Sequence, residues 1–186
     1  GGDASALTEQ QQRGFELFIN QGRCVSCHVI EQTQALFTDN RFHNIGVGIN
    51  DVQSDVPDLA SEFIRADLEL AEVDVKVLGD ARTSELGRFA VTTGFDDLGS
   101  FKTSTLRNIA VTAPYMHDGS LETLREVVVH YNNGGVTNEG DPVNDFLSGG
   151  IRPLDLNDDQ IDDLVAFLES LTSPQFAALA EAAGGE

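Results

Sequence analysis

The sequence CVSCH at residues 24–28, Cys24-Val25-Ser26-Cys27-His28, decides how the rest of the chain must fold. Cys-x-x-Cys-His is the attachment pattern of c-type haem, in which two thiols add across the vinyl groups of the porphyrin. Once both cysteines hold the ring, the adjacent histidine can bind the iron from one face. The pattern therefore predicts a covalent haem, with Cys24 and Cys27 as anchors and His28 as the proximal iron ligand.

Two other kinds of site use paired cysteines, and the rest of the sequence disfavours both. A structural zinc site normally takes four nitrogen or sulfur ligands. Cys24 and Cys27 are the only cysteines, and no second ligand cluster follows them. A thioredoxin-like redox pair is expected within a βαβ pattern, which is missing here. Haem is the preferred interpretation.

The composition limits the classes of partner. The chain has 186 residues, of which 40% are hydrophobic, enough for one packed domain. Its formal net charge is −20, from 31 acidic and 11 basic residues. This charge argues against nucleic acid as a partner, and it suits either a redox partner with a basic docking surface or a saline habitat.

The expected location is outside the cytoplasm. No apolar run approaches the length of a membrane-spanning helix. Bacteria attach haem to this motif outside the cytoplasm, so we expect a periplasmic or secreted protein. On this interpretation either a leader peptide has been removed or Gly1 marks a processing boundary.

Helical periodicity predicts an all-α, cytochrome c-like haem domain with long irregular loops. We expect this single domain to span residues 1–176, and the Ala/Gly-rich tail 177–186 to be frayed. The expected helices cover residues 8–22, 58–70, 84–93, 121–133 and 157–171.

Capping residues mark where several of these helices begin. Thr8 with Gln11 forms a capping-box pattern, and Asn157 begins the last helix ahead of two acidic residues. Thr83 is expected to cap the helix that ends before Gly94. The apolar face of the last helix is expected to pack on the first one, near its phenylalanines.

The helix at residues 121–133 carries a candidate iron ligand. A rigid turn precedes it, and Ser120 is expected to cap it. Its apolar stripe contains Tyr131, whereas His130 lies about 100° away on the helical wheel. We therefore expect Tyr131, and not His130, to point into the interior.

Two further polar residues are candidates for the site. His43 lies in a turn-rich stretch that is expected to wrap one edge of the haem. A hydrogen-bonded structural role is preferred for it over iron ligation, because polar groups in loops need partners. Arg107 is expected either to reach a haem propionate, since its fork geometry suits a carboxylate, or to form a surface salt bridge.

Taken in order, these motifs resemble the C-terminal haem domain of the bacterial dihaem cytochrome c peroxidase superfamily, including its MauG branch. The matching stretches are Cys24-Val25-Ser26-Cys27-His28, Phe42-His43-Asn44-Ile45-Gly46-Val47, Gly99-Ser100-Phe101-Lys102-Thr103, Thr105-Leu106-Arg107-Asn108, Pro114-Tyr115-Met116-His117-Asp118-Gly119-Ser120, His130-Tyr131-Asn132 with Gly134-Gly135, and Leu154-x-Leu156.

The resemblance also implies what this chain lacks. Enzymes of the family carry two Cys-x-x-Cys-His motifs; the N-terminal haem reacts with peroxide, and the C-terminal haem stores and relays an electron. This chain has one motif. It is expected to be either a separated domain or a free-standing one-haem carrier. Family calcium sites lie between the two domains and use carbonyls at the positions of Thr112 and Pro114, so calcium is doubtful here.

The resemblance bears on the distal iron ligand as well. Tyr131 falls where the peroxidases place a methionine ligand and where the MauG branch places a tyrosine, so Tyr131 is the favoured distal ligand. Met116, the only methionine, is the alternative, because His/Met ligation is usual in electron-transfer cytochromes c. An open or water-filled site is the third option.

Three functions follow from these interpretations. The first is transfer of single electrons between an external donor and a second haem domain or redox partner. The second is a peroxide-reactive enzyme with an open distal site, in which His117 or His43 serves as acid and base. The third is a haem-based sensor or structural module.

Overall fold

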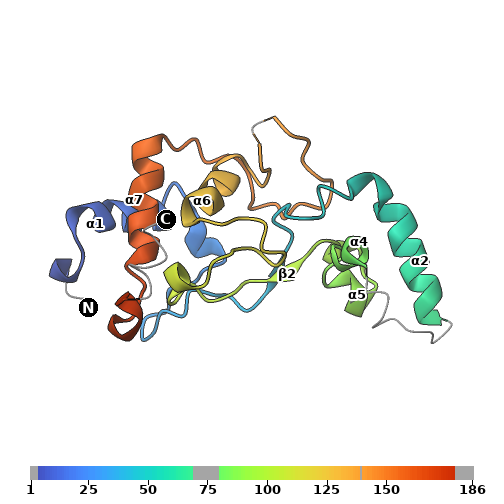
Figure 1. Ribbon diagram of the computed structural model, residues 1–186, viewed down its shortest axis with the longest axis horizontal. Coiled ribbons are helices and arrows are strands. Elements are labelled where there is room, and N and C mark those ends of the chain that lie inside the picture. Colours follow the sequence, from blue (N-terminus) through green and yellow to red (C-terminus); the bar gives the residue numbers. More distant parts are fainter. Residues whose placement is uncertain (1–3, 69–79, 139, 179–186) are drawn as a thin grey trace.

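The computed structural model describes residues 4–68, 80–138 and 140–178 (Figure 1). The helices are α1 (Glu9–Ile19), α2 (Val56–Leu68), α4 (Ala81–Ser84), α5 (Phe89–Thr92), α6 (Leu124–Asn132) and α7 (Asp158–Glu169). Short 3₁₀ turns are η1 (Ala4–Ala6), η2 (Cys24–Ser26), η3 (Gln53–Asp55), η4 (Phe95–Asp97), η5 (Ile109–Val111) and η6 (Pro174–Phe176). The strands are β1 (Phe42–His43) and β2 (Phe101–Lys102). Among the described residues, none of these helices combines the length and apolar character needed to cross a bilayer.

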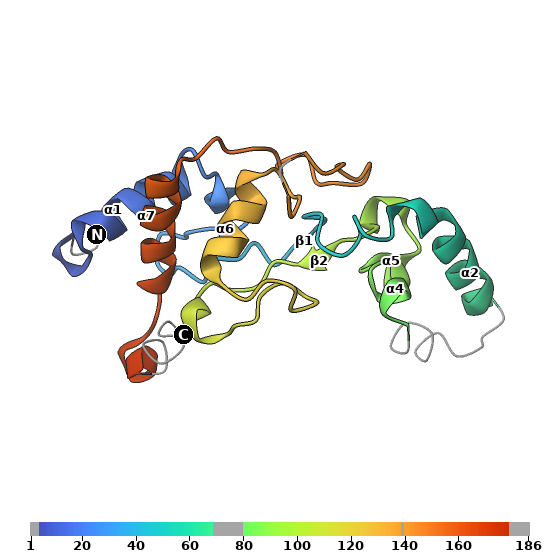
Figure 2. The same cartoon turned by 45° about the horizontal axis from the view of Figure 1, so that its top comes forward.

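The expectation of an all-α fold holds in its coarser form, since the chain is rich in helices. It needs one correction, because β1 and β2 form a two-stranded antiparallel sheet that pairs Phe42 with Lys102 and His43 with Phe101. This sheet lies between two lobes (Figure 2). One lobe contains α1, α6 and α7, and the other contains α2, α4 and α5 (Figures 1 and 2).

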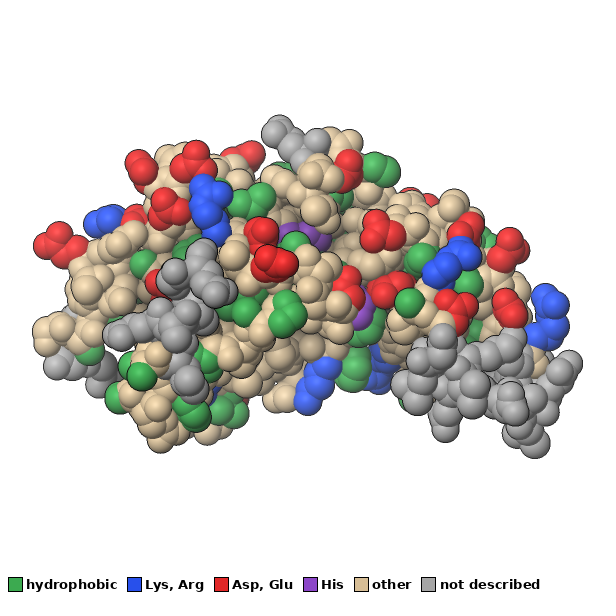
Figure 3. Space-filling model, in the orientation of Figure 1, with side chains coloured by type: hydrophobic (Ala, Val, Ile, Leu, Met, Phe, Trp, Pro, Cys, Tyr) green, Lys and Arg blue, Asp and Glu red, His purple; other side chains and the backbone are tan. Residues whose placement is uncertain are grey.

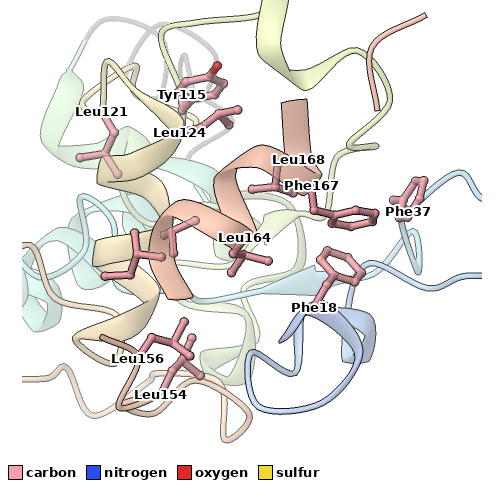
Figure 4. Close-up of a cluster of buried hydrophobic side chains, with 12 residues drawn as sticks. Phe18, Phe37, Tyr115, Leu121, Leu124, Leu154, Leu156, Leu164, Phe167 and Leu168 are labelled. Atoms are coloured by element: carbon pink, nitrogen blue, oxygen red, sulfur yellow. The ribbon is translucent and has the colours of Figure 1, made fainter. Parts of the chain in front are cut away.

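Each lobe has its own buried apolar core. The core of the α1/α6/α7 lobe consists of Phe18, Phe37, Tyr115, Leu121, Leu124, Val128, Leu154, Leu156, Ile161, Leu164, Phe167 and Leu168 (Figure 4). The core of the α2/α4/α5 lobe consists of Ile49, Val52, Val56, Leu59, Ala60, Phe63, Leu86, Phe89 and Leu98. The single domain expected over residues 1–176 stays a prediction.

The predicted packing of the last helix on the first is confirmed. Phe167 of α7 contacts Phe15 and Phe18 of α1, with both pairs of ring centroids 5.3 Å apart. Gly14 lets the two helices approach closely, because a β-carbon there would lie 1.9 Å from the backbone oxygen of Asp163. The carboxylate of Asp163 accepts two hydrogen bonds, at 2.7 and 2.8 Å, from the guanidinium of Arg13 on α1.

Local capping signals predicted two helix starts correctly. The hydroxyl of Thr8 accepts from the Gln11 amide while the Gln11 side chain accepts from the Thr8 amide. Asn157 and Gln160 form the same reciprocal box at the start of α7. Each box satisfies backbone donors that a first helical turn otherwise leaves unpaired.

Two other helix predictions were wrong. The helix expected over residues 84–93 is two short helices, with Asp80 and not Thr83 as the cap of α4. Gly87 separates them in a left-handed conformation (φ 58°), and the chain there forms a bridge to Ser100. α6 begins later than expected: Thr123, not Ser120, is its cap, in a reciprocal box with Glu126.

Two other predictions extend past the described residues. The helix expected over residues 58–70 is described as α2 up to Leu68, and its expected end at Leu70 lies outside the described residues. Most of the tail 177–186, from residue 179 onward, lies outside them as well.

Candidate functional site

A cavity of about 340 Å³ lies beside the core of the α1/α6/α7 lobe. Its wall brings together most of the residues that the sequence singled out, from four different segments of the chain. They are Cys24, Cys27, His28, His43, Met116, His117 and Tyr131. Most of the rest of the wall is apolar and includes Phe18, Ile45, Phe101, Leu106, Ile109, Leu124, Val127, Val128, Leu164 and Leu168. The wall therefore suits a large apolar ligand held by a few polar groups.

The two cysteines lie on and just after η2, and their surroundings do not favour thiolate chemistry. Burial raises the pKa of the Cys24 thiol from 9.0 to about 12, and burial also raises the pKa of Cys27. Reactive redox cysteines and zinc ligands need the opposite shift. The two side chains lie in the wall of an apolar cavity, where neutral sulfur is the stable form, which suits thioether anchors.

His28 is oriented by a hydrogen bond at Nδ1, which leaves Nε2 as the expected iron-binding atom. Its Nδ1 lies 2.8 Å from the carbonyl oxygen of Phe37. A carbonyl only accepts, so Nδ1 carries the proton and Nε2 of the neutral ring keeps a free lone pair. Burial lowers the pKa of His28, which favours this neutral form. A histidine that donates its other ring N–H to a carbonyl is the usual arrangement of a metal ligand.

Tyr131 and Met116 reach the same cavity from different elements. Tyr131 lies near the C-terminal end of α6, and burial, followed by the proximity of Cys24 and Cys27, raises the pKa of its phenol. Met116 lies in the turn before α6, in a left-handed backbone conformation with φ of 72°. Both residues are in the wall together with His28, so either is available to the cavity.

The expectation that His130 points away from the interior was wrong. His130 is only 2% exposed, and its Nε2 donates to the carbonyl of Ile45 at 2.8 Å. The loop that contains Ile45 covers this side of α6, so the helix is buried on more than the one face that its apolar stripe predicted. Burial lowers the pKa of His130 and keeps the ring neutral.

The two remaining histidines are each paired with a carboxylate. His117 stacks on Phe101 with ring centroids 3.5 Å apart, and its Nε2 lies 2.8 Å from a carboxylate oxygen of Glu85. His43 Nε2 lies 2.8 Å from Asp39. Burial by itself would raise the pKa of Asp39, but hydrogen bonds from His43 and from the backbone lower it below its usual value. His43 thus has the hydrogen-bond partner that its preferred structural role requires.

Donor atoms of Cys27, Asp39 and His43 lie within 4.8 Å of one another. Sulfur, oxygen and nitrogen in one place could bind a metal ion. However, burial keeps the Cys27 thiol protonated, and a thioether bond at Cys27 would remove its sulfur from such a site. This cluster is better interpreted as the surroundings of a haem anchor.

The structure does not place Arg107 in the cavity. Its side chain is exposed and donates to the carbonyl of Ala35 at 3.1 Å, whereas the preceding Leu106 lines the cavity. Neighbouring side chains point in different directions at this irregular turn. The sequence has no periodicity here from which those directions could be predicted. Three cations that were not predicted do lie in the wall, namely Arg23, Lys102 and Arg152. One signal was available, because Arg23 directly precedes the Cys-x-x-Cys-His motif.

The residues present fit a c-type haem. The cavity is largely apolar, the two sulfurs are neutral, and His28 is held with an open ring nitrogen. The N–H at Nε of Arg23 is buried and has no hydrogen-bond partner among the described residues, which leaves a donor for an anionic part of a ligand.

Comparisons with known proteins agree with this geometry. No family model matches the chain. It is 37% identical to cytochrome-c peroxidase IdrP2 of Denitromonas iodatirespirans over 171 residues, covering 92% of this chain and 42% of the relative. It is 31% identical to methylamine utilization protein MauG of Methylorubrum extorquens over 170 residues, covering 91% of this chain and 36% of the relative.

Solved structures give the same result. A MauG-like protein associated with microbial copper homeostasis matches with a TM-score of 0.62 and 30% identity, over 94% of this chain and 49% of that one. A variant of the dihaem peroxidase BthA from Burkholderia thailandensis matches with a TM-score of 0.58 and 25% identity, over 91% of this chain and 43% of that one. The resemblance to cytochrome c peroxidases and MauG proteins is therefore confirmed. The chain spans less than half the length of the curated relatives it matches.

Proposed function

We propose that this chain, similar to cytochrome c peroxidases and MauG proteins, is a c-type haem domain that transfers single electrons. One observation carries the proposal. The same cavity wall contains the motif residues Cys24, Cys27 and His28 and a second residue able to bind iron, Tyr131 or Met116. If His28 and either Tyr131 or Met116 both bind the haem iron, no position would remain for a substrate, and the chemistry supplied by the group would be gain and loss of an electron.

In this proposal the bound haem supplies the one-electron redox couple. The chain's own residues hold and surround it. Cys24 and Cys27 fix the ring, the Phe37 carbonyl orients His28, and the apolar wall excludes water. Exclusion of water and a fixed ligand geometry keep structural change on electron transfer small.

Tyr131 is the proposed distal ligand, with Met116 as the alternative. Tyr131 lies on a helix held at its N-terminus by a capping box, whereas Met116 lies in an irregular turn. The raised pKa of Tyr131 means that its phenolate forms only if a nearby positive charge compensates the loss of hydration. Ferric iron would provide that charge, and tyrosinate ligation would favour the ferric state and lower the reduction potential.

Spectroscopy of the haem-loaded domain tests this assignment. If Tyr131 is the ligand, Tyr131→Phe changes the ferric absorption and electron paramagnetic resonance spectra, while Met116→Ala leaves them unchanged. A far-red methionine-to-iron charge-transfer band that disappears in Met116→Ala would instead assign the site to Met116. A high-spin ferric spectrum unaffected by either substitution would refute both assignments.

A peroxide-reactive enzyme is the second candidate function. It is supported by two histidines of the cavity wall that each contact a carboxylate, His117 with Glu85 and His43 with Asp39. A histidine oriented by a carboxylate is a common arrangement of a general acid and base. Turnover of hydrogen peroxide by the haem-loaded domain with a reduced donor distinguishes the candidates. Absence of turnover together with a six-coordinate spectrum would leave the electron carrier.

Location and partners are proposed on the same basis. We place the domain outside the cytoplasm, where haem attachment to this motif occurs, and we propose a redox protein or second haem domain as its partner. The high negative charge favours a partner with a basic docking surface over nucleic acid. One haem is proposed for this chain. Calcium stays doubtful, because the carbonyls of Thr112 and Pro114 would need a second domain.

A further inference from the structure

Several arginines of the two lobes are paired with nearby carboxylates. Figure 3 shows acidic side chains spread over both lobes of the face in view. Four arginines outside the cavity wall form ion pairs with aspartates: Arg13 with Asp163, Arg82 with Asp55, Arg88 with Asp97, and Arg125 with Asp158 and Asp162. The other described arginines outside the cavity wall are Arg41, Arg65 and Arg107, which are exposed to solvent, where water and salt screen their charge.

Three further cations lie in the cavity wall. Arg23, Lys102 and Arg152 all line the cavity, and within the described ranges none of them forms an ion pair. The aspartates and glutamates that are so common elsewhere do not neutralise them. Positive charge kept beside an apolar cavity indicates a ligand that carries its own negative charge.

Arg23 gives the sharpest evidence. Its Nε is buried and has no hydrogen-bond partner among the residues that the structure describes. A buried donor of this kind costs about 1–3 kcal/mol if it stays unpaired, and more when the group is charged. Arg23 also adopts a left-handed backbone conformation, φ 52°, which is uncommon for a residue with a side chain. This conformation is kept directly before the first haem anchor, Cys24.

A hydrogen bond joins Arg23 to the segment that carries Arg152. Nη2 of Arg23 donates to the carbonyl of Pro153 at 3.2 Å, and Pro153 directly follows Arg152 in the chain. This contact joins the segment before the haem motif to a loop some 130 residues later. The contact places the backbone next to Arg152 within hydrogen-bond reach of Arg23, and both arginines line the cavity.

We propose that Arg23 and Arg152 form a carboxylate-binding edge of the cavity and hold the haem propionates. The inference rests on the proposed function in one respect, that the cavity holds haem. It transfers to this pair the role that sequence reasoning gave to Arg107. Guanidinium forks suit carboxylates because two parallel N–H groups match two oxygens.

A crystal structure of the haem-loaded domain provides the direct test. We expect a propionate oxygen within about 2.7–3.2 Å of Arg23 Nε, with Arg152 on the same or the other propionate. Propionates directed to Arg107 or to solvent would overturn the inference and leave the proposed function intact. A cavity that takes up no haem would instead refute the proposed function.

A titration in solution gives an independent measurement. The pH dependence of the midpoint potential reports the pKa of a propionate near the iron. An adjacent cation lowers the pKa of a carboxyl group by about 1–3 units. Arg23→Gln and Arg152→Gln should therefore raise the propionate pKa by at least about one unit and lower the midpoint potential at neutral pH.

The controls separate charge at the cavity from charge in general. Arg107→Gln removes the same charge from an exposed position bonded to Ala35 and should leave both quantities unchanged. Arg23→Lys should restore most of the effect of the lost charge. Equal shifts in the Arg107 and Arg23 variants would overturn the inference. If Arg23→Gln prevents haem loading, the Arg152 variant and the crystal structure of the unaltered domain still decide it.

Discussion

Replacing Gly14 with alanine tests whether the close contact of α1 and α7 holds the α1/α6/α7 lobe together. The β-carbon of alanine would lie 1.9 Å from the backbone oxygen of Asp163 and 2.8 Å from the β-carbon of Phe167. Backbone atoms cannot rotate away as a long side chain can. The helices must therefore move apart and disturb the aromatic contacts of Phe18 with Phe167.

The expected magnitude follows from two opposing effects. Overpacking a well-packed site costs about 1–3 kcal/mol, and a backbone clash belongs at the upper end. Alanine in a helix gains about 1 kcal/mol over glycine. The net loss of unfolding free energy at Gly14 is therefore about 2 kcal/mol. With a urea dependence of about 2 kcal/mol per molar, the unfolding midpoint should fall by about 1 M.

Urea unfolding of the haem-loaded domain, followed by helical circular dichroism, measures this shift. Gly149→Ala is the matched control, because a β-carbon there meets no atom within 4 Å. The unfolding free energy of Gly149→Ala should stay within about 0.5 kcal/mol of that of the unaltered protein. If Gly14→Ala unfolds at the same urea concentration as Gly149→Ala, the close contact of the two helices does not hold in solution.

Two further changes test polar contacts. Hydrogen bonds from the backbone at the start of α6 lower the pKa of Glu126. The stability that Glu126 contributes is therefore present above its unfolded pKa of about 4.5. It is lost as the pH falls through the lower pKa of the folded protein. Glu126→Gln should therefore flatten the dependence of the urea midpoint on pH between about 5 and 3, whereas Glu122→Gln should leave that dependence unchanged. Equal pH dependences in the two variants would contradict the capping role of Glu126. Asn44, 1% exposed, donates to the Leu98 carbonyl at 2.9 Å and to Asn144 at 3.2 Å. Asn44→Ala should lower the unfolding free energy by about 2–3 kcal/mol, since buried partners are left unpaired; thermal unfolding that matches the unaltered protein would refute this.

Features that depend on residues close together in the chain could be predicted from the sequence. The Cys-x-x-Cys-His motif and the capping boxes at Thr8 and Asn157 each lie within five residues, and the packing of α1 on α7 follows from apolar periodicity. Local signals were less decisive where several candidates compete. Ser120 and Thr123 are both acceptable caps, and the one with a glutamate three residues later was used.

Features that depend on distant partners could not be predicted in this way. His130 is buried because Ile45, 85 residues away, accepts its hydrogen bond. Asn44 is buried because Leu98 and Asn144 supply partners from two other segments. His130 was expected not to point into the interior, and nothing was predicted for the side chain of Asn44, because no local pattern shows which distant group will accept or donate the hydrogen bond. The order of such residues along the chain carries no information about which loops will meet.

The burial of His130 beside Tyr131 bears on the proposed role of Tyr131 as a distal iron ligand. A helix with one buried face can rotate slightly about its axis at small cost, and a tyrosine on it would then be aimed loosely. α6 is instead held on two sides, by its apolar stripe against the core and by the His130 hydrogen bond to the Ile45 loop. Rotation would break a buried hydrogen bond, which costs about 1–3 kcal/mol. The hydrogen bond of His130 thus helps to fix the direction of Tyr131, the proposed iron ligand next to it.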